Sequence, residues 1–423
     1  MHDLRMFRDG VDTLREAMRR RGRADLEPLM ARAQRVDQDR RASIQAVEER
    51  KAARNTASQE VARRKKSGED ASDLIAQTRA LGQEIGRLEQ ELATSEGELS
   101  SLMLEFPNLL LSDVPPGGED CAVVLRTWGE PRQEASLLPH WEIGDRLGIL
   151  DLARGAKIAG SGFPLFRGDG ARLTRALITF MLELHTREHG YEELWVPLLV
   201  NRASATATGH LPKFEDDMYA IRGEGLFLVP TAEVPVTSLM RDEVLDGAQL
   251  PLRYTAYTPC FRREAGAHGK DTRGMLRLHQ FDKVEMVWYS TPEQSPDGHE
   301  LLTTHAETVL QRLGLPYRVI LLAGGDTGFS SAKTYDIEVW SPGVGKWLEA
   351  SSCSTFTDFQ ARRANIRYRP APGEKPRFVH TLNGSGVAFA RTMAALLEHY
   401  QRPDGRVTVP EVLRPHLGTD TLG

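Results

Sequence analysis

Apolar residues in the first hundred positions recur at the spacing of a coiled coil. Between 74 and 102 they alternate in steps of four and three residues over about four heptads, which places them on one face of a helix. The seam consists of Leu74, Thr78, Leu81, Ile85, Leu88, Leu92, Ser95, Leu99 and Leu102. A thinner seam from Leu26 to about Val61 predicts a second helix, and Lys66–Asp70 supplies turn residues between the two. The pattern predicts an antiparallel helical hairpin over about 26–103.

The two predicted helices differ in charge. Residues 15–66 carry sixteen Lys and Arg against eight Asp and Glu, whereas residues 67–105 carry two against nine. Opposite charge favours pairing of the two helices, and helices of this length, roughly 55 Å at about 1.5 Å per residue, exceed what a compact core needs. A dimerisation coiled coil or a solvated spacer is the simplest interpretation. The basic helix and its tip at Arg63, Arg64, Lys65 and Lys66 leave phosphate binding open.

A cluster of helix-breaking residues separates the hairpin from the rest of the chain. Phe106-Pro107 and then Pro115-Pro116-Gly117-Gly118 mark a boundary. Beyond it, an amphipathic helix ends at His189-Gly190, and short alternating strands follow without regular strand–helix–strand alternation. We expect an α+β protein with three parts: an N-terminal domain at 1–110, a linker at 111–120, and an antiparallel sheet flanked by helices at 121–423.

Composition restricts the class of protein. The 423 residues are 40% hydrophobic and 27% charged with a net charge of −5, which is ordinary globular usage and excludes a uniformly basic surface. The three cysteines are far apart and form no C-x-x-C pair, so we expect neither a disulfide framework nor a cysteine-rich zinc site. No apolar run resembles a signal peptide or a membrane span. These features favour a cytoplasmic protein.

Two predicted strands carry the most informative side chains. The chain has no P-loop, and the glycines at 160 and 162 lack dinucleotide-binding spacing. Strand alternation places Arg262 with Glu264 on one face, and Phe281 with Lys283 and Glu285 on one face. A solvated face with cross-strand ion pairs is the simpler interpretation. A phenylalanine among these charges also suits the stacking of a ligand base.

These strands resemble the second signature motif of class II aminoacyl-tRNA synthetases, in the form found in seryl-tRNA synthetases. The resemblance rests on Phe261–Glu264, the loop 265–274 and His279–Glu285, and it extends to further segments along the chain. The further segments are Asn383–Arg391 for the third motif, the helix ending at Gly190 with Val196–Leu198 for the first motif, and Thr231–Pro235 and Glu349–Ser354, which are typical of the serine enzyme. With the N-terminal hairpin, the resemblance covers essentially the whole chain.

The resemblance implies a two-step reaction. Serine and ATP would form seryl-adenylate and pyrophosphate, and serine would then pass to the 3′ end of tRNA(Ser), with tRNA(Sec) as a further substrate in many relatives. It implies Mg²⁺ with the ATP, no zinc, and a homodimer whose interface includes the first motif. Preorganised cations suit the phosphate chemistry better than a protein nucleophile does.

The resemblance also assigns roles at the ATP end. Arg262 would bridge the α-phosphate and the serine carboxylate, Glu264 would accept from the adenine amino group, and Phe281 would stack on adenine. Arg391 would cover the other adenine face and reach the γ-phosphate, so that Arg262, Arg391 and Glu349 are the implied catalytic residues. The remaining implied ATP contacts are Arg263, Leu278, Ala350, Ser351 and Ser352.

The serine, metal and tRNA contacts follow from the same resemblance. The implied serine contacts are Thr231, Ala232, Glu233, Arg262, Glu285 and Ser385. Glu349 and Ser352 match magnesium ligands, although strand parity alone does not put positions 349 and 352 on one face. Besides the hairpin tip, Lys270, Arg273 and Arg277 are candidates for contact with tRNA.

The chain departs from the family pattern at two positions, and three other classes of protein compete with the resemblance. Gly162 stands where many relatives have a bulkier residue, and Ala350 where a β-branched residue is commoner. A hydrolase of another class would need a catalytic triad or a metal-ligand cluster, and neither is evident. A pure coiled-coil protein leaves the charged strands unexplained. A relative that charges a carrier protein would lack a hairpin of this kind.

Overall fold

The computed structural model describes residues 1–265 and 273–423, and these residues form two compact units. Unit 1 comprises residues 1–19 and 23–106, and unit 2 comprises residues 20–22 and 107–423. The short segment 20–22 therefore clusters with unit 2 although unit 1 surrounds it in sequence. Lys270, one of the candidate tRNA contacts, lies outside the described residues.

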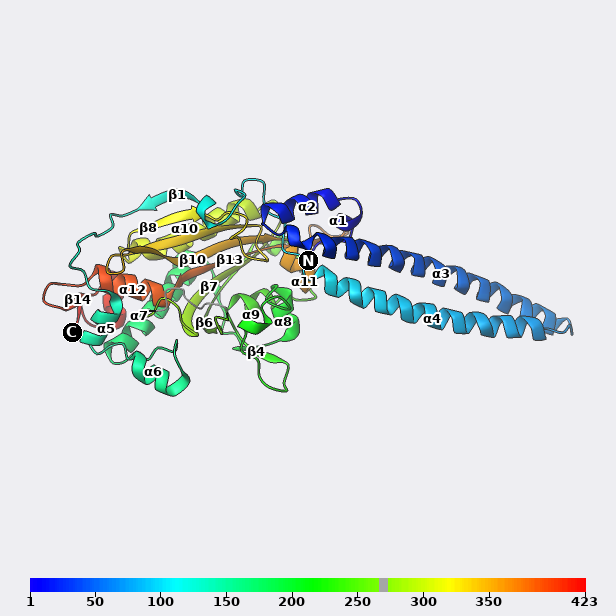
Figure 1. The fold of residues 1–423 in the computed structure, drawn as a ribbon, viewed down its shortest axis with the longest axis horizontal. Helices are drawn as coiled ribbons and strands as arrows, with labels where there is room; N and C mark the ends of the chain where they lie inside the picture. The colour runs from blue at the N-terminus through cyan, green and yellow to red at the C-terminus, as the bar shows by residue number, and fades with distance from the viewer. Residues whose placement is uncertain (266–272) are drawn as a thin grey trace. The chain divides into compact units, whose positions relative to one another are not determined.

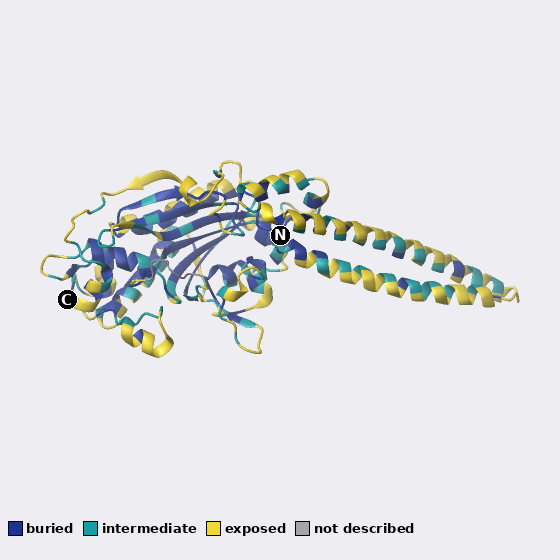
Figure 2. Ribbon diagram, in the orientation of Figure 1, coloured by how far each residue is buried: buried dark blue, intermediate teal, exposed yellow. Residues whose placement is uncertain are grey.

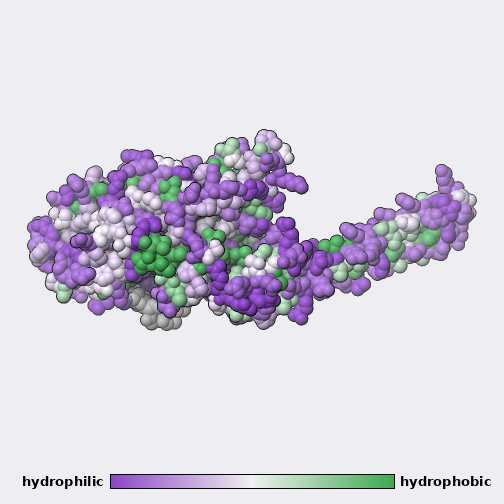
Figure 3. Space-filling model, turned by 90° about the horizontal axis from the view of Figure 1, so that it is seen from above, coloured by the Kyte–Doolittle hydropathy of each residue, from purple (hydrophilic) through white to green (hydrophobic). Residues whose placement is uncertain are grey.

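Unit 1 is dominated by a long helical hairpin. After α1 (Arg5–Arg8), α2 (Val11–Arg20) and a short turn, α3 (Glu27–Lys66) and α4 (Ser72–Met103) run antiparallel and side by side (Figure 1). All the seam positions predicted between 74 and 102 are buried or half-buried, and the outer faces of both helices are exposed (Figure 2). Hydrophilic side chains cover most of the hairpin face seen in Figure 3. The predicted hairpin is confirmed.

Ion pairs cross the hairpin between its basic and acidic helices. Arg32 pairs with Glu98 at 2.7 Å, and Lys51 pairs with Glu89 at 2.6 Å. Each such exposed pair contributes at most about 1 kcal/mol, so the apolar seam supplies most of the stability and the pairs favour the antiparallel register.

One buried carboxylate interrupts the seam of α3. Asp37 is 1% exposed and accepts two hydrogen bonds from the Arg8 guanidinium, at 2.6 and 2.7 Å. These bonds lower the pKa of Asp37 below its usual value. The pair joins α1 to α3, which the hydrophobic pattern did not indicate because an aspartate at a seam position reads as a break in the pattern.

Unit 2 is built on an eight-stranded sheet. Its strands, in spatial order, are β1 (Val123–Trp128), β8 (Tyr317–Leu321), β9 (Lys333–Ser341), β10 (Lys346–Thr357), β13 (His380–Ala388), β7 (Gln280–Ser290), β6 (Leu252–Phe261) and β2 (Glu192–Glu193). Every neighbouring pair is antiparallel except β2 with β6. The predicted antiparallel sheet is confirmed.

Helices cover this sheet and bury its apolar side chains. Val284, Met286 and Trp288 alternate along β7 and are at most 2% exposed. The helix α10 (Ser295–Arg312) packs along β13 and β10, α12 (Phe389–His399) packs across β9 and β10, and α7 (Asp169–Glu183) packs against β6 and β7. The helix α7 continues as a wider helical turn before Gly190, where the sequence predicted its end. The sheet and helices α7, α10 and α12 thus share one core.

Shorter elements complete unit 2. They are α5 (His140–Arg146), α6 (Leu152–Ala159), α8 (Arg202–Ala207), α9 (Glu233–Thr237), α11 (Phe359–Ala364), α13 (Arg414–Leu417), β3 (Leu199–Asn201), β4 (Leu226–Leu228), β5 (Val244–Asp246), β11 (Arg367–Arg369), β12 (Arg377–Phe378), β14 (Val407–Thr408) and β15 (Thr421–Leu422). Among the described residues, no helix combines the length and the apolar character that crossing a bilayer requires.

Candidate active site

A cavity of about 530 Å³ opens in unit 2 against strands β6, β7, β10 and β13. Most of the predicted serine and ATP contacts line it. They are Thr231, Glu233, Arg262, Glu264, Leu278, Phe281, Glu285, Glu349, Ala350, Ser351, Ser352, Ser385 and Arg391. Two predicted contacts do not: Ala232 is fully buried, and the backbone of Arg263 donates to the Asp217 carbonyl at 2.9 Å. Most of the residues that the sequence predicted to contact serine or ATP therefore lie together in one cavity.

A buried carboxylate forms one end of the cavity. Glu285 on β7 is 0% exposed and accepts hydrogen bonds from Asn383 Nδ2 at 2.7 Å and Thr231 Oγ1 at 3.1 Å. Lys283, two residues earlier on the same face, forms an ion pair with it. Ser385 on β13 lies directly opposite Glu285 in the strand register. Strand alternation correctly placed Lys283 and Glu285 together, but Asn383 comes from register, which one sequence does not reveal.

A second carboxylate lies at the same end. Burial, and then the negative charge of Glu285, raise the pKa of Glu233 to about 7. Gln360 Nε2 donates to one of its oxygens at 2.7 Å. An ammonium group entering here would meet two carboxylates and would favour the ionised form of Glu233.

Cations and an aromatic ring also line the cavity. The Arg262 guanidinium carbon lies 5.1 Å from the centre of the Phe281 ring. Arg391 donates to the Glu349 carbonyl at 2.7 Å and pairs with the Glu349 carboxylate at 3.3 Å. Two guanidinium groups that line one cavity suit a ligand with several negative charges.

Arg277 has a different environment from the one that its candidate role implies. It lines the cavity and pairs with Glu264 at 3.0 Å, the carboxylate to which the resemblance gives an adenine contact. Arg273, the other described candidate of that loop, stacks its guanidinium over Trp141 at 4.6 Å.

A β-bulge brings Glu349 and Ser352 to one face. The register of β10 against β9 shifts between Glu349 and Ser351, so Ala350 is the extra residue. Before the shift, Glu349 lies opposite Glu338, and after it, Ser352 lies opposite Asp336. Because Asp336 and Glu338 are two residues apart on β9, they and their partners share a face. Strand parity failed here because a bulge adds one residue.

Asp336 adds a carboxylate that the sequence did not single out. It is 8% exposed, its Oδ1 has no hydrogen-bond partner, and burial followed by the charge of Glu349 raises its pKa well above the usual value. Together with Glu349 and Ser352 it offers oxygen atoms, the ligands that Mg²⁺ prefers. No group of three His, Cys, Asp or Glu with metal-binding geometry occurs in the described part of the chain. Substrate phosphates would have to complete such a coordination sphere.

Two further segments line the cavity, and no periodicity or motif in the sequence marks them. They are Thr208–His210 and Gly328–Ser331. Burial, and then the charge of Arg262, lower the pKa of His210 to about 3, so its imidazole is neutral at physiological pH. Both segments are irregular loops rich in small residues, and periodicity gives no information about such segments.

Gly162 is closely packed at the edge of this region. It adopts a φ of +83°, and a Cβ atom there would lie 2.3 Å from His279 Cδ2. The Gly162 carbonyl accepts from the His279 backbone N–H at 2.8 Å. A bulkier residue would require His279 to move. Glycine at position 162 therefore fits the position that His279 has in this chain.

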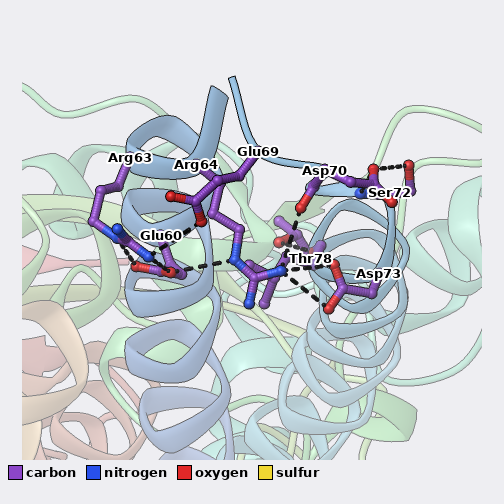
Figure 4. Close-up of polar contacts among 9 residues, drawn as sticks. Glu60, Arg63, Arg64, Glu69, Asp70, Ser72, Asp73 and Thr78 are labelled. Atoms are coloured by element: carbon purple, nitrogen blue, oxygen red, sulfur yellow. Dashed lines mark hydrogen bonds and ion pairs between the residues drawn. The ribbon is translucent and has the colours of Figure 1, made fainter. Parts of the chain in front are cut away.

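The basic tip of the hairpin is partly neutralised by acids. Arg63 donates twice to Glu60, at 2.6 and 2.8 Å, and Arg64 reaches Glu60 and Asp73 (Figure 4). The guanidinium groups lower the pKa of Glu60 to about 2. Lys65 and Lys66 are exposed at the end of α3.

Comparison with known proteins gives consistent results for both units. Residues 1–110 match the family described as the seryl-tRNA synthetase N-terminal domain, and residues 213–400 match the tRNA synthetase class II core domain (G, H, P, S and T). A serine–tRNA ligase of Gemmatimonas aurantiaca is 62% identical over 424 residues and covers 100% of both chains.

Solved structures agree with these matches. The seryl-tRNA synthetase of Pyrococcus horikoshii, solved with ATP, has 36% identity and a TM-score of 0.95, covering 100% of this chain and 99% of its own. The cytoplasmic serine–tRNA ligase of Naegleria fowleri, solved with AMP, has 28% identity and a TM-score of 0.88, covering 100% and 98%.

Proposed function

The chain belongs to the seryl-tRNA synthetase family of class II aminoacyl-tRNA synthetases, whose members join serine to tRNA with ATP, and we propose that the cavity of unit 2 is where this chain does so. The observation that carries the proposal is the pair of buried carboxylates, Glu233 and Glu285, in a cavity that Arg262 and Arg391 also line. Such a site separates an ammonium end from a phosphate end.

We propose that serine binds at the carboxylate end. Its ammonium group pairs with Glu285 and Glu233 and displaces Lys283 from Glu285. Its hydroxyl contacts Ser385, which lies opposite Glu285. A site that hydrogen-bonds this hydroxyl discriminates strongly against alanine, by up to about 10⁴–10⁵, whereas threonine has to be excluded by steric fit.

We propose that ATP binds at the arginine end. Adenine stacks on Phe281, and Glu264 accepts from its amino group after releasing Arg277. Arg262 holds the serine carboxylate beside the α-phosphate. A carboxylate oxygen then attacks the α-phosphorus, the bond to the bridging oxygen breaks, and pyrophosphate leaves near Arg391. The protein contributes position and charge in this step and forms no covalent bond to substrate.

We propose that Mg²⁺ enters with the ATP. Glu349 and Ser352 would hold it, and the unpartnered Asp336 oxygen supports an oxygen-rich site there. Held there by Glu349 and Ser352, the ion would supply positive charge against the phosphate groups of ATP. In the same way, Arg262 and Arg391 preorganise positive charge before the reaction begins.

We propose that the hairpin of unit 1 contacts tRNA and that the enzyme is a cytoplasmic homodimer. The excess of Lys and Arg in α3 supports contacts with phosphates. Large apolar side chains are exposed in and beside the segment that resembles the first motif, with Leu198 40% and the neighbouring Trp195 87% exposed, which supports an interface there. The tRNA substrate is tRNA(Ser), and tRNA(Sec) belongs in the same charging assay.

Pyrophosphate exchange with each of the twenty amino acids tests the proposed site. Exchange should require ATP and Mg²⁺ and should be fastest with serine, with alanine and threonine at least 10²-fold slower. Charging assays with tRNA(Ser), tRNA(Sec) and an unrelated tRNA then test the second step. Equal exchange with serine and alanine would contradict the assignment of Ser385.

A further inference from the structure

A loop in the wall of the cavity is held from behind by a buried arginine. Residues 328–331 line the cavity. Arg21 is 5% exposed, and its guanidinium donates to the carbonyls of Thr327 at 2.9 Å, Gly328 at 3.2 Å and Ser331. A single side chain therefore holds three carbonyls of one short loop.

Asn108 fastens the same loop beside Arg21. Its Nδ2 donates to the Ser330 carbonyl at 2.9 Å, and its backbone N–H donates to the Phe329 carbonyl at 2.9 Å. Its own carbonyl accepts from Arg21 Nε at 2.6 Å. Arg21 lies six residues before α3 begins at Glu27, and Asn108 lies five residues after α4 ends at Met103. The loop is thus held by the two segments through which the chain enters and leaves the hairpin.

The environment of Arg21 is unusual for a buried charge. The hydrogen bonds that it makes within the described residues all go to carbonyl oxygens, and burial lowers its pKa to about 9. Burying a cation without a carboxylate partner costs free energy. The guanidinium group of Arg21 has several N–H donors in fixed directions, which allows it to bond several carbonyl oxygens at once. The geometry of the loop depends on that fork.

The loop is connected to the serine end of the cavity through a short series of contacts. Ser330 Oγ donates to the Thr208 carbonyl at 2.8 Å. Gln360 Nε2 donates to the same carbonyl at 3.3 Å and to Glu233 at 2.7 Å. The packing is tight, because a Cβ on Gly209 would lie 2.1 Å from Ser330 Oγ. A shift of the loop therefore moves Thr208 and disturbs the bond that orients Glu233.

We propose that Arg21, together with Asn108, is a positioning residue for the serine end of the cavity. It touches no substrate. It holds loop 327–331 so that Ser330 and Gln360 fix Glu233 in place. The proposal rests on the proposed function, because it takes the Glu233 end of the cavity as the place where serine binds.

Paired lysine substitutions test this proposal in the full chain. Lysine keeps the charge of Arg21 but cannot bond several carbonyls as a fork. The matched control is Arg20→Lys, because the Arg20 guanidinium also bonds backbone carbonyls, those of Leu111, Ser112 and Val114, none of which lines the cavity. In pyrophosphate exchange, Arg21→Lys should raise the KM for serine at least fivefold and leave the KM for ATP within twofold. Arg20→Lys should leave both within twofold.

A second variant keeps the test decisive if Arg21→Lys folds poorly. Ser330→Ala removes only the hydroxyl that reaches Thr208, and it should raise the KM for serine at least threefold, again without a matching change for ATP. Thermal unfolding of each variant separates loss of folded protein from the change in KM. Unchanged serine KM in Ser330→Ala, or equal increases for serine and ATP in Arg21→Lys, would overturn the proposal. Absence of serine-dependent exchange in the unmodified chain would instead contradict the proposed function.

Discussion

The hairpin of unit 1 and the cavity of unit 2 differ in the contacts that stabilise each of them. In the hairpin, the seam positions of α4 recur every three or four residues, so the same kind of packing against α3 repeats along the helix. In the cavity, Glu285 is bonded by Thr231 and Asn383, which are 54 and 98 positions away in sequence. A repeated structure can lose one contact and keep its form. A site in which each contact occurs once cannot, so single substitutions should have small effects in the hairpin and large effects in the cavity.

Removing the hairpin should separate the two chemical steps most sharply. Deletion of residues 30–100, closed by a short Gly-Ser linker, should leave serine-dependent pyrophosphate exchange within about threefold. It should lower tRNA charging by at least 10³-fold, because the phosphate contacts of the basic helix are lost. The two rates are measured on the same preparation, and the salt dependence of tRNA binding should become flatter. Collapse of exchange in a protein that remains folded would mean that the site of unit 2 depends on the hairpin.

Among single substitutions, Glu285→Gln should cause the largest loss of serine-dependent pyrophosphate exchange, because it removes a buried negative charge. Removing one partner of a buried ion pair costs about 3–5 kcal/mol, so exchange at low serine concentration should fall by on the order of 10²–10³-fold or more. The KM for ATP should change much less. Asp282→Asn is the matched control, because Asp282 is a carboxylate on the same strand that accepts from Tyr257 at 2.7 Å outside the cavity lining. Equal weakening of serine and ATP would contradict the role given to Glu285.

The pH dependence of serine use should report on Glu233. Its pKa is raised to about 7, so the carboxyl is mostly protonated at pH 6 and mostly ionised at pH 8. Since serine binds as an ammonium ion, kcat/KM for serine should rise about tenfold between these two values, in proportion to the ionised fraction. Glu233→Gln should abolish this rise while lowering the plateau. A profile that stays flat in the unmodified enzyme would show that Glu233 is not the group that receives the ammonium.

The contrast between the two regions also explains which structural features could be predicted from the sequence. The hairpin followed from periodicity because each helix repeats its apolar positions at a short, regular spacing, whereas the buried Asp37 of α3 was not indicated by that pattern. The shared face of Lys283 and Glu285 followed from strand alternation. The approach of Glu349 to Ser352 did not, because the bulge at Ala350 changes the parity and nothing in a single sequence marks a bulge.

The contacts behind the cavity wall depend on register and on loops. Asp336 lies opposite Ser352 only because of the way β9 pairs with β10. Arg21 reaches loop 327–331 across some 300 positions of sequence, and no local pattern relates the two. The resemblance to a known family supplied the cavity residues to which we give serine and ATP contacts, but it did not supply these contacts behind them, since motifs identify residues and not the partners that hold them.

The smallest expected effect concerns a single ion pair in the hairpin. Lys51 and Glu89 lie 2.6 Å apart with side chains 46% and 48% exposed, so solvent and salt screen their attraction. A double-mutant cycle with Lys51→Met and Glu89→Met should give a coupling free energy below about 1 kcal/mol, measured as the change in the opening free energy of hairpin amides by hydrogen exchange in the full chain. The coupling should vanish near 1 M salt, whereas the apolar seam should keep the hairpin closed. A coupling well above 1 kcal/mol that persists at high salt would mean that single contacts in the hairpin matter as much as those in the cavity.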